Sequence, residues 1–173
     1  GPQGLELYMY CKLLWNPDLD VARELALYYQ NYYGPAAAPM KRYHEALEAA
    51  ARSSRYYGSG GDQIEKIFTD DFLKQLGEFI QKAREQVHGK EPYEKRLEGV
   101  WAGYEFARQL REFFKLKQNL KILEANQAMQ NLEKFVLSYK EGDVFDNGPN
   151  MYPGIANLCL RVHLKEIQEQ ADL

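Results

Sequence analysis

Apolar residues recur at intervals of three and four along almost the whole chain, the spacing that places them on one face of an α-helix. No segment alternates apolar and polar residues between turn signals, as a half-buried strand would. The pattern predicts an all-α fold, an irregular bundle of six or seven helices that forms a single domain over residues 1–173. The helices are expected over residues 5–15, about 20–33, 35–56, 70–87, 92–117, 120–139 and 154–170. The apolar stripe of the first helix consists of Leu5, Tyr8, Met9, Leu13 and Leu14, and that of the sixth helix of Ile122, Ala125, Met129, Leu132, Val136 and Tyr139.

The junction between the first two predicted helices is the sequence LLWNPDLD, residues 13–20. Pro17 ends the first helix and forms a turn with Asn16. Asp18 or Asp20 can then accept hydrogen bonds from the N–H groups that open the second helix. We expect Trp15 and Pro17 to fix the angle between the two helices.

A second junction follows at Tyr33, Gly34 and Pro35. Gly34 is placed to supply the left-handed residue that closes the second helix. Pro35 stands where a third helix can start without losing a hydrogen bond. Further along, Thr69 is a candidate N-cap for the helix that contains Phe72, Leu76, Phe79, Ala83 and Val87 in step.

The paired acids have a catalytic interpretation as well as a structural one. Glycoside hydrolysis uses two carboxylates about 5 to 10 Å apart, and Asp18 and Asp20 could form such a pair. Two acids separated by one residue at a helix start are more typical of caps that complement the helix dipole. We favour this capping interpretation, and we extend it to Asp70 and Asp71 after Thr69.

Tyrosine is the one compositional oddity, with thirteen copies in 173 residues. Tyrosines in clusters can form platforms on which sugar rings stack, and Tyr29, Tyr33 and Tyr57 are the candidate ligand-binding residues. The commoner arrangement places such rings inward on half-buried helix faces, with the hydroxyls at the edge. The tyrosines in question are Tyr28, Tyr29, Tyr32, Tyr33, Tyr56 and Tyr57.

Other kinds of chemistry have little support in the sequence. The formal net charge is −3 and basic residues are scattered among acids, so we expect no nucleic-acid partner. His44, His88 and His163 are too dispersed for a metal motif, and no phosphate-binding or nucleophile motif occurs, so we predict no metal, no cofactor and no catalytic residues. No apolar run approaches the roughly 18 residues of a membrane span.

The cysteines, Cys11 and Cys159, lie near opposite ends of the chain. A disulfide between them would staple the two ends together. Two small buried apolar side chains are the interpretation we favour. The pair therefore does not decide the compartment.

Residues 8–43, YMYCKLLWNPDLDVARELALYYQNYYGPAAAPMKRY, resemble a segment of bacterial carbohydrate-active proteins that directly follows a TIM-barrel glycoside hydrolase-like domain. In those proteins a helix ends in an aliphatic-Trp-Asn/Asp-Pro pattern, matched here by Leu14, Trp15, Asn16 and Pro17, and Tyr-Tyr-Gly-Pro-Ala follows one helix later, matched here by residues 32–36. The family is a C-terminal helical domain of unknown function, similar in placement to the C-terminal helical domain of alpha-glucuronidases. The resemblance covers about the first quarter of the chain.

The resemblance implies a non-catalytic accessory domain, taken from the C-terminal part of a longer protein, that packs beside the TIM barrel of the same parent chain. It would brace the barrel or help to shape its substrate cleft, and it could contribute to a homodimer. The catalytic carboxylates would belong to the barrel strands. The resemblance also favours an exported protein, periplasmic or at the cell surface. Alternatives are an independent carbohydrate-binding module that uses surface tyrosines and, ranked last, an enzyme in its own right.

Overall fold

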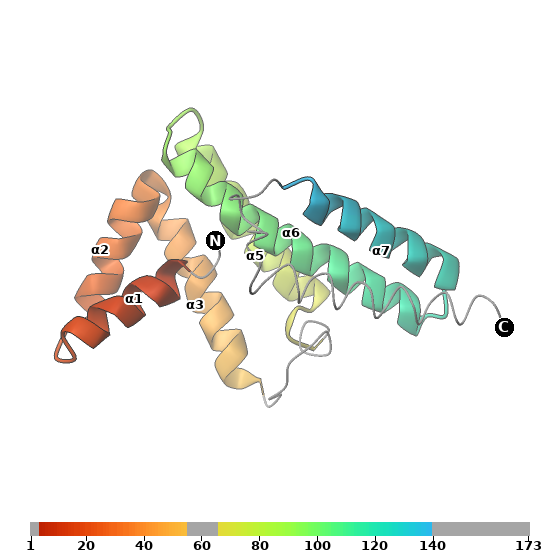
Figure 1. Ribbon diagram of the computed structural model, residues 1–173, viewed down its shortest axis with the longest axis horizontal. Coiled ribbons are helices and arrows are strands. Elements are labelled where there is room, and N and C mark those ends of the chain that lie inside the picture. Colours follow the sequence, from red (N-terminus) through yellow and green to blue (C-terminus); the bar gives the residue numbers. More distant parts are fainter. Residues whose placement is uncertain (1–3, 55–65, 140–173) are drawn as a thin grey trace. The chain divides into compact units, whose positions relative to one another are not determined.

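The computed structural model describes residues 4–54 and 66–139, and over these residues the predicted all-α class is confirmed, with no strand (Figure 1). The predicted helix over residues 154–170 lies outside the described residues. The helices are α1 (Gly4–Trp15), α2 (Val21–Tyr33), the short 3-10 helix η1 (Gly34–Ala36), α3 (Ala37–Ser53), α5 (Asp70–Val87), α6 (Tyr93–Gln118) and α7 (Ile122–Leu137).

The described residues form two compact units. Unit 1 contains residues 4–53 and 74–102, and unit 2 contains residue 54 with residues 66–73 and 103–139. Helices α5 and α6 each continue from one unit into the other. Apolar periodicity did not indicate this division, because it shows which face of a helix is apolar and not which helix covers that face.

The core of unit 1 combines the aromatic residues of α2 and α3 with aliphatic residues of α5 and α6. The α5 stripe is turned slightly from the prediction, because Ile80 is buried while the predicted Phe72 and Phe79 are only half-buried. The buried hydrophobic residues of unit 1 are Tyr28, Tyr29, Tyr33, Ala36, Met40, Tyr43, Leu76, Ile80, Ala83, Val87, Leu97, Val100 and Ala102.

The core of unit 2 lies between α6 and α7, which run side by side (Figure 1). Four of the residues predicted for the apolar stripe of α7 are buried there, so the periodicity oriented this helix correctly. The cluster consists of Leu110, Phe113, Phe114, Ala125, Met129, Leu132 and Val136.

Helix α1 differs from the other helices because none of its residues is buried. Leu5, Tyr8 and Met9 of the predicted stripe are half-buried, whereas Leu13 and Leu14 are exposed. Cys11 is exposed too, so the prediction that its side chain is buried is wrong. Its predicted companion, Cys159, lies outside the described residues.

Candidate functional site

At the first junction the structure separates the two aspartates. The Asp20 side chain accepts a hydrogen bond from the backbone N–H of Arg23 at 3.1 Å, which confirms Asp20 as the N-cap of α2. Asp18 is exposed and does not cap the helix; its backbone N–H donates to Asn16 Oδ1 at 3.1 Å within the turn. The two side chains therefore have different surroundings, and the carboxylate of Asp20 is bound to the backbone at the start of α2.

Trp15 does not fix the angle between α1 and α2, and that prediction is wrong. Its side chain is 92% exposed, so it packs on neither helix. The two helices are joined by Glu24, which accepts a hydrogen bond from the Tyr8 hydroxyl at 2.8 Å and pairs with Lys12 Nζ at 3.2 Å. These bonds, the one from Tyr8 first, hold the pKa of the Glu24 carboxyl below its usual value. The ring of Tyr8 also packs against that of Tyr28, with centroids 5.0 Å apart.

Gly34 closes α2 as predicted, with φ +53° and its N–H bonded to the carbonyl of Gln30. The structure adds a second reason for glycine. A Cβ at this position would lie 2.5 Å from Cζ of the Tyr93 ring, inside any real carbon–carbon contact. Pro35 lies in the short 3-10 helix η1, which begins at Gly34, and α3 begins at Ala37, two residues later than predicted.

Arg96 of α6 holds the end of α2. Its Nη1 donates to the carbonyls of Asn31, at 3.1 Å, and Tyr32, at 2.8 Å. The guanidinium also lies over the rings of Tyr32 and Tyr93, at 4.9 and 5.6 Å from their centroids. The Tyr-Tyr-Gly-Pro motif is thus where the start of α6 binds the end of α2, within unit 1. Sequence reasoning missed both Arg96 and Tyr93, since they lie some sixty residues away along the chain.

The tyrosines proposed as sugar platforms are inside the molecule. Tyr29 and Tyr33 are buried, so the prediction that they bind a ligand by stacking is wrong; Tyr57 lies outside the described residues. A hydrogen bond of 3.1 Å joins the Tyr33 hydroxyl to Nε2 of His44. Burial raises the pKa of Tyr29 to about 12 and lowers that of His44 to about 4. The cluster is therefore an uncharged part of the core at neutral pH.

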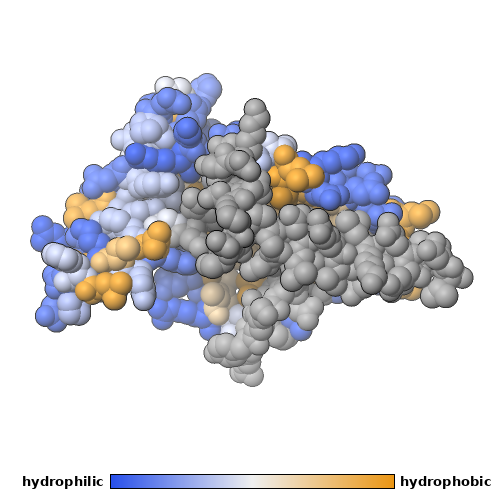
Figure 2. All heavy atoms as spheres, viewed as in Figure 1, coloured by the Kyte–Doolittle hydropathy of each residue, from blue (hydrophilic) through white to orange (hydrophobic). Residues whose placement is uncertain are grey.

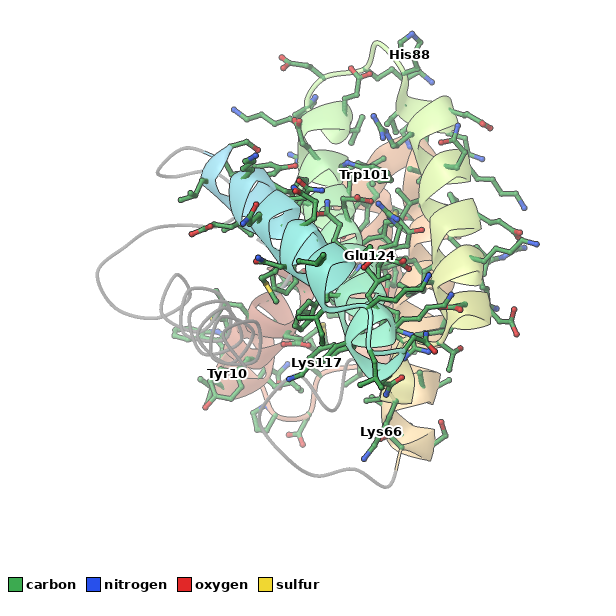
Figure 3. The ribbon with its side chains drawn as sticks, turned by 90° about the vertical axis from the view of Figure 1, so that its right-hand side faces the viewer. Tyr10, Lys66, His88, Trp101, Lys117 and Glu124 are labelled. Carbon is green, nitrogen blue, oxygen red and sulfur yellow. The ribbon has the colours of Figure 1, made fainter. Side chains whose placement is uncertain are left out.

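Helix α1 has one exposed, mostly apolar side, which we call the α1 outer face. It is formed by Leu7, Tyr10, Cys11 and Leu14. These residues follow one another at intervals of three, one and three, so they lie on one side of the helix. The exposed fractions are 64% for Leu7, 65% for Tyr10 and 70% for Leu14. Hydrophobic residues, drawn in orange, are visible along α1 in Figure 2, and Tyr10 is labelled in Figure 3.

The α1 outer face carries no charged residue. The helix has two charged side chains: Glu6 is exposed at the edge of this face, one turn before Tyr10, and Lys12 is bound to Glu24 on the side that faces α2. Trp15 extends the exposed apolar surface at the end of the helix. Exposed apolar residues gathered on one side of a helix make the α1 outer face a candidate binding surface.

Three other polar residues singled out in the sequence, Thr69, Asp70 and His88, have structural partners. Thr69 Oγ1 accepts from the N–H of Phe72 at 3.2 Å, which confirms the predicted cap. Asp70 pairs with Lys115 Nζ at 3.0 Å, and this hydrogen bond lowers its pKa. His88, at the turn between α5 and α6 (Figure 3), pairs with Glu94 at 3.3 Å.

Within residues 4–54 and 66–139, no three histidine, cysteine, aspartate or glutamate side chains come together as a metal site. Over the same part of the chain, none of the helices is both long and apolar enough to cross a membrane. Comparison with family models, with curated proteins and with solved structures gave no match. The α1 outer face is therefore the strongest candidate for a functional site.

Proposed function

We propose that this chain is a non-catalytic helical accessory domain of a bacterial carbohydrate-processing protein, and that it packs beside a TIM-barrel domain of the same parent chain through the α1 outer face. The observation that carries the proposal is the exposure of α1, a helix of 12 residues that buries none of them. Of the residues that resemble the helix following a barrel, Leu14 and Trp15 end this same helix, and Asn16 and Pro17 form the turn that follows it.

The energetics favour a docked α1. An isolated helix of about 12 residues is marginal in water. Within its own unit α1 has the half-buried Leu5, Tyr8 and Met9 and the ion pair of Lys12, but no fully buried residue. Each leucine that becomes fully buried in an interface contributes roughly 1.5 to 3 kcal/mol. Burial of Leu7 and Leu14 against a second domain would therefore supply stabilisation that α1 lacks in unit 1.

The accessory role also fits the surroundings of the acids. Asp20 accepts a backbone N–H, and Asp70 is paired with Lys115. Asp20 is exposed at a helix start, and the hydrogen bond from Lys115 holds the pKa of Asp70 below its usual value, whereas a general acid requires a raised pKa. In this proposal the hydrolytic chemistry belongs to the barrel.

A direct binding test uses the upstream domain of the parent protein, produced separately and titrated with the 173-residue chain in a calorimeter. We expect saturable binding, and a loss of affinity of about tenfold or more in the L7E/L14E variant. The variant should keep its melting temperature because neither residue is buried. Leu120→Glu, at another exposed leucine, serves as the matched control and should bind normally. Equal binding by L7E/L14E and the parent chain would refute docking through α1.

Tyr29 and Tyr33 no longer support the alternative of an independent glycan-binding module, and over residues 4–54 and 66–139 the exposed aromatic residues are Tyr10 and Trp15. Titration of the chain with a panel of glycans, followed by tryptophan fluorescence, separates the two functions. The accessory role predicts no saturable signal. A saturable signal that Trp15→Ala abolishes would favour glycan binding instead.

A further inference from the structure

The side-chain contacts that join α1 to α2 converge on Glu24 and Tyr28, which lie one turn apart on α2. The Glu24 carboxylate accepts a hydrogen bond from the Tyr8 hydroxyl at 2.8 Å and pairs with Lys12 Nζ at 3.2 Å. The ring of Tyr8 packs on that of Tyr28, with centroids 5.0 Å apart. Over the described part of the chain, the polar bonds from α1 side chains to α2 both end on Glu24. A single carboxylate therefore supplies the polar attachment of this helix.

The apolar contribution to the attachment is small. None of the 12 residues of α1 is buried, and Leu5, Tyr8 and Met9 are only half-buried. Segments with few buried apolar contacts open locally, at a lower free energy than unfolding of the whole protein. Hydrogen bonds to charged groups are stronger than those between neutral groups. The bonds to Glu24 are therefore expected to decide how often α1 separates from α2.

Helix α2 does not depend on α1 for its own structure. Asp20 caps its first turn through the N–H of Arg23 at 3.1 Å. Tyr33, at its other end, is buried, and its hydroxyl is joined to Nε2 of His44 on α3 by a hydrogen bond of 3.1 Å. Residues 16–18, in the turn between α1 and α2, are exposed, so a change of backbone direction there disturbs no core residue. Movement of α1 would therefore leave α2 and α3 intact.

We propose that α1 is a strap that opens from α2 as a unit, with the turn at residues 16–19 as its hinge and Glu24 as the residue that holds it closed. Opening breaks both bonds of Glu24 and uncovers the inner side of α1, where Leu5, Tyr8 and Met9 lie. The strap allows the α1 outer face to change its position relative to the rest of unit 1. The inference uses only the contacts between α1 and α2 and stands independently of the proposed function.

Hydrogen exchange of the 173-residue chain, followed by mass spectrometry, tests the strap because it reports the opening of each helix separately. In the parent chain we expect the amides of α1 to be protected, but less than those of α3. Glu24→Ala removes both bonds without lowering helix propensity, and it should speed exchange in α1 about tenfold or more. Exchange in α3 and in the second half of α2 should stay unchanged.

Glu48→Ala is the matched control for this replacement. Glu48 is an exposed glutamate of α3, in the same unit, and it is bound to Arg52 at 2.7 Å. The control makes the same change of charge and side chain but touches no residue of α1. Exchange in α1 should therefore remain at the rate of the parent chain.

A double-mutant cycle identifies the bond that matters. Tyr8→Phe keeps the ring on Tyr28 and removes the hydroxyl, and it should speed exchange in α1 by about threefold or more. In the Glu24→Ala background the same replacement should have no further effect, because the acceptor is already absent. An equal effect of Tyr8→Phe in both backgrounds would contradict the role of Glu24.

Three other outcomes would overturn the proposal. An α1 without protection in the parent chain would show that the helix is not held closed. Equal exchange of α1 in Glu24→Ala and Glu48→Ala would show that Glu24 does not hold it. Loss of protection throughout α2 and α3 in Glu24→Ala would show that α1 does not open as a separate unit.

Discussion

Replacement of Gly34 by alanine should destabilise the protein more than replacement of any glycine that is merely at positive φ. Two costs add at this position. The backbone has φ +53° and ψ −119°, a region that residues with a Cβ disfavour by about 1 kcal/mol or more. The added Cβ would also meet three atoms of the Tyr93 ring, at 2.5, 2.7 and 2.9 Å, so the ring must move.

The cost of displacing the Tyr93 ring depends on the contacts that the ring makes. Tyr93 lies under the Arg96 guanidinium, which in turn binds the carbonyls at the end of α2. Overpacking of this kind costs roughly 1 to 3 kcal/mol, and with the backbone term we expect a total of about 2 to 4 kcal/mol for Gly34→Ala. Gly89→Ala is the matched control, because Gly89 has φ +71° and no atom within 4 Å of the added Cβ. It should cost only the backbone term, about 1 kcal/mol.

Urea denaturation followed by circular dichroism measures both free energies of unfolding. In a double-mutant cycle, Tyr93→Ala should remove most of the extra cost of Gly34→Ala, because the two groups collide directly. Equal destabilisation by Gly34→Ala and Gly89→Ala would show that the ring contact contributes nothing. Additive effects of Gly34→Ala and Tyr93→Ala would contradict the collision.

Three further predictions follow from local geometry. Leu120, two residues beyond the end of α6, has φ +56° and a side chain that is 82% exposed, so Leu120→Gly should raise the free energy of unfolding by about 1 kcal/mol; a free energy below that of the parent chain would contradict the strain. Asp20→Ala should cost about 1 kcal/mol and Asp18→Ala much less, and equal losses would refute the cap. Burial lowers the pKa of His44 from 6.5 to about 4 on folding. The neutral His44 therefore contributes its full share to the free energy of unfolding above pH 6.5. This free energy falls by up to about 3 kcal/mol as the pH falls from 6.5 toward 4. Chemical denaturation across this pH range should show that loss in the parent chain relative to His44→Gln, and parallel pH profiles would disprove it.

The sequence predicted the features that depend on neighbours along the chain. The period of α7, the caps Asp20 and Thr69 and the turn at Gly34 all follow from residues within a few positions of one another. The predictions that were wrong concern burial, that is, which side chains are covered by another helix. An apolar residue such as Trp15 has the same periodicity whether a second helix covers it or not, and it is exposed.

Long-range partners were invisible for a related reason. Arg96 binds carbonyls 64 and 65 residues away, and no local pattern points to those atoms. Tyr29 and Tyr33 were candidates for a surface platform because the chain has thirteen tyrosines, more than a core of ordinary composition needs. In the structure the rings pack on one another, with centroids 6.3 Å apart, and this aromatic contact accounts for the excess in unit 1.

The thiol of Cys11 offers the most direct measurement of the central claim, because it lies on the α1 outer face and is exposed in this chain. Its rate of alkylation can be measured in the 173-residue chain and in the full parent protein, each carrying Cys159→Ser so that only this thiol of the domain reacts. If the face docks on a barrel, the thiol should react about tenfold or more slowly in the parent protein. Equal rates in the two proteins would contradict docking through α1.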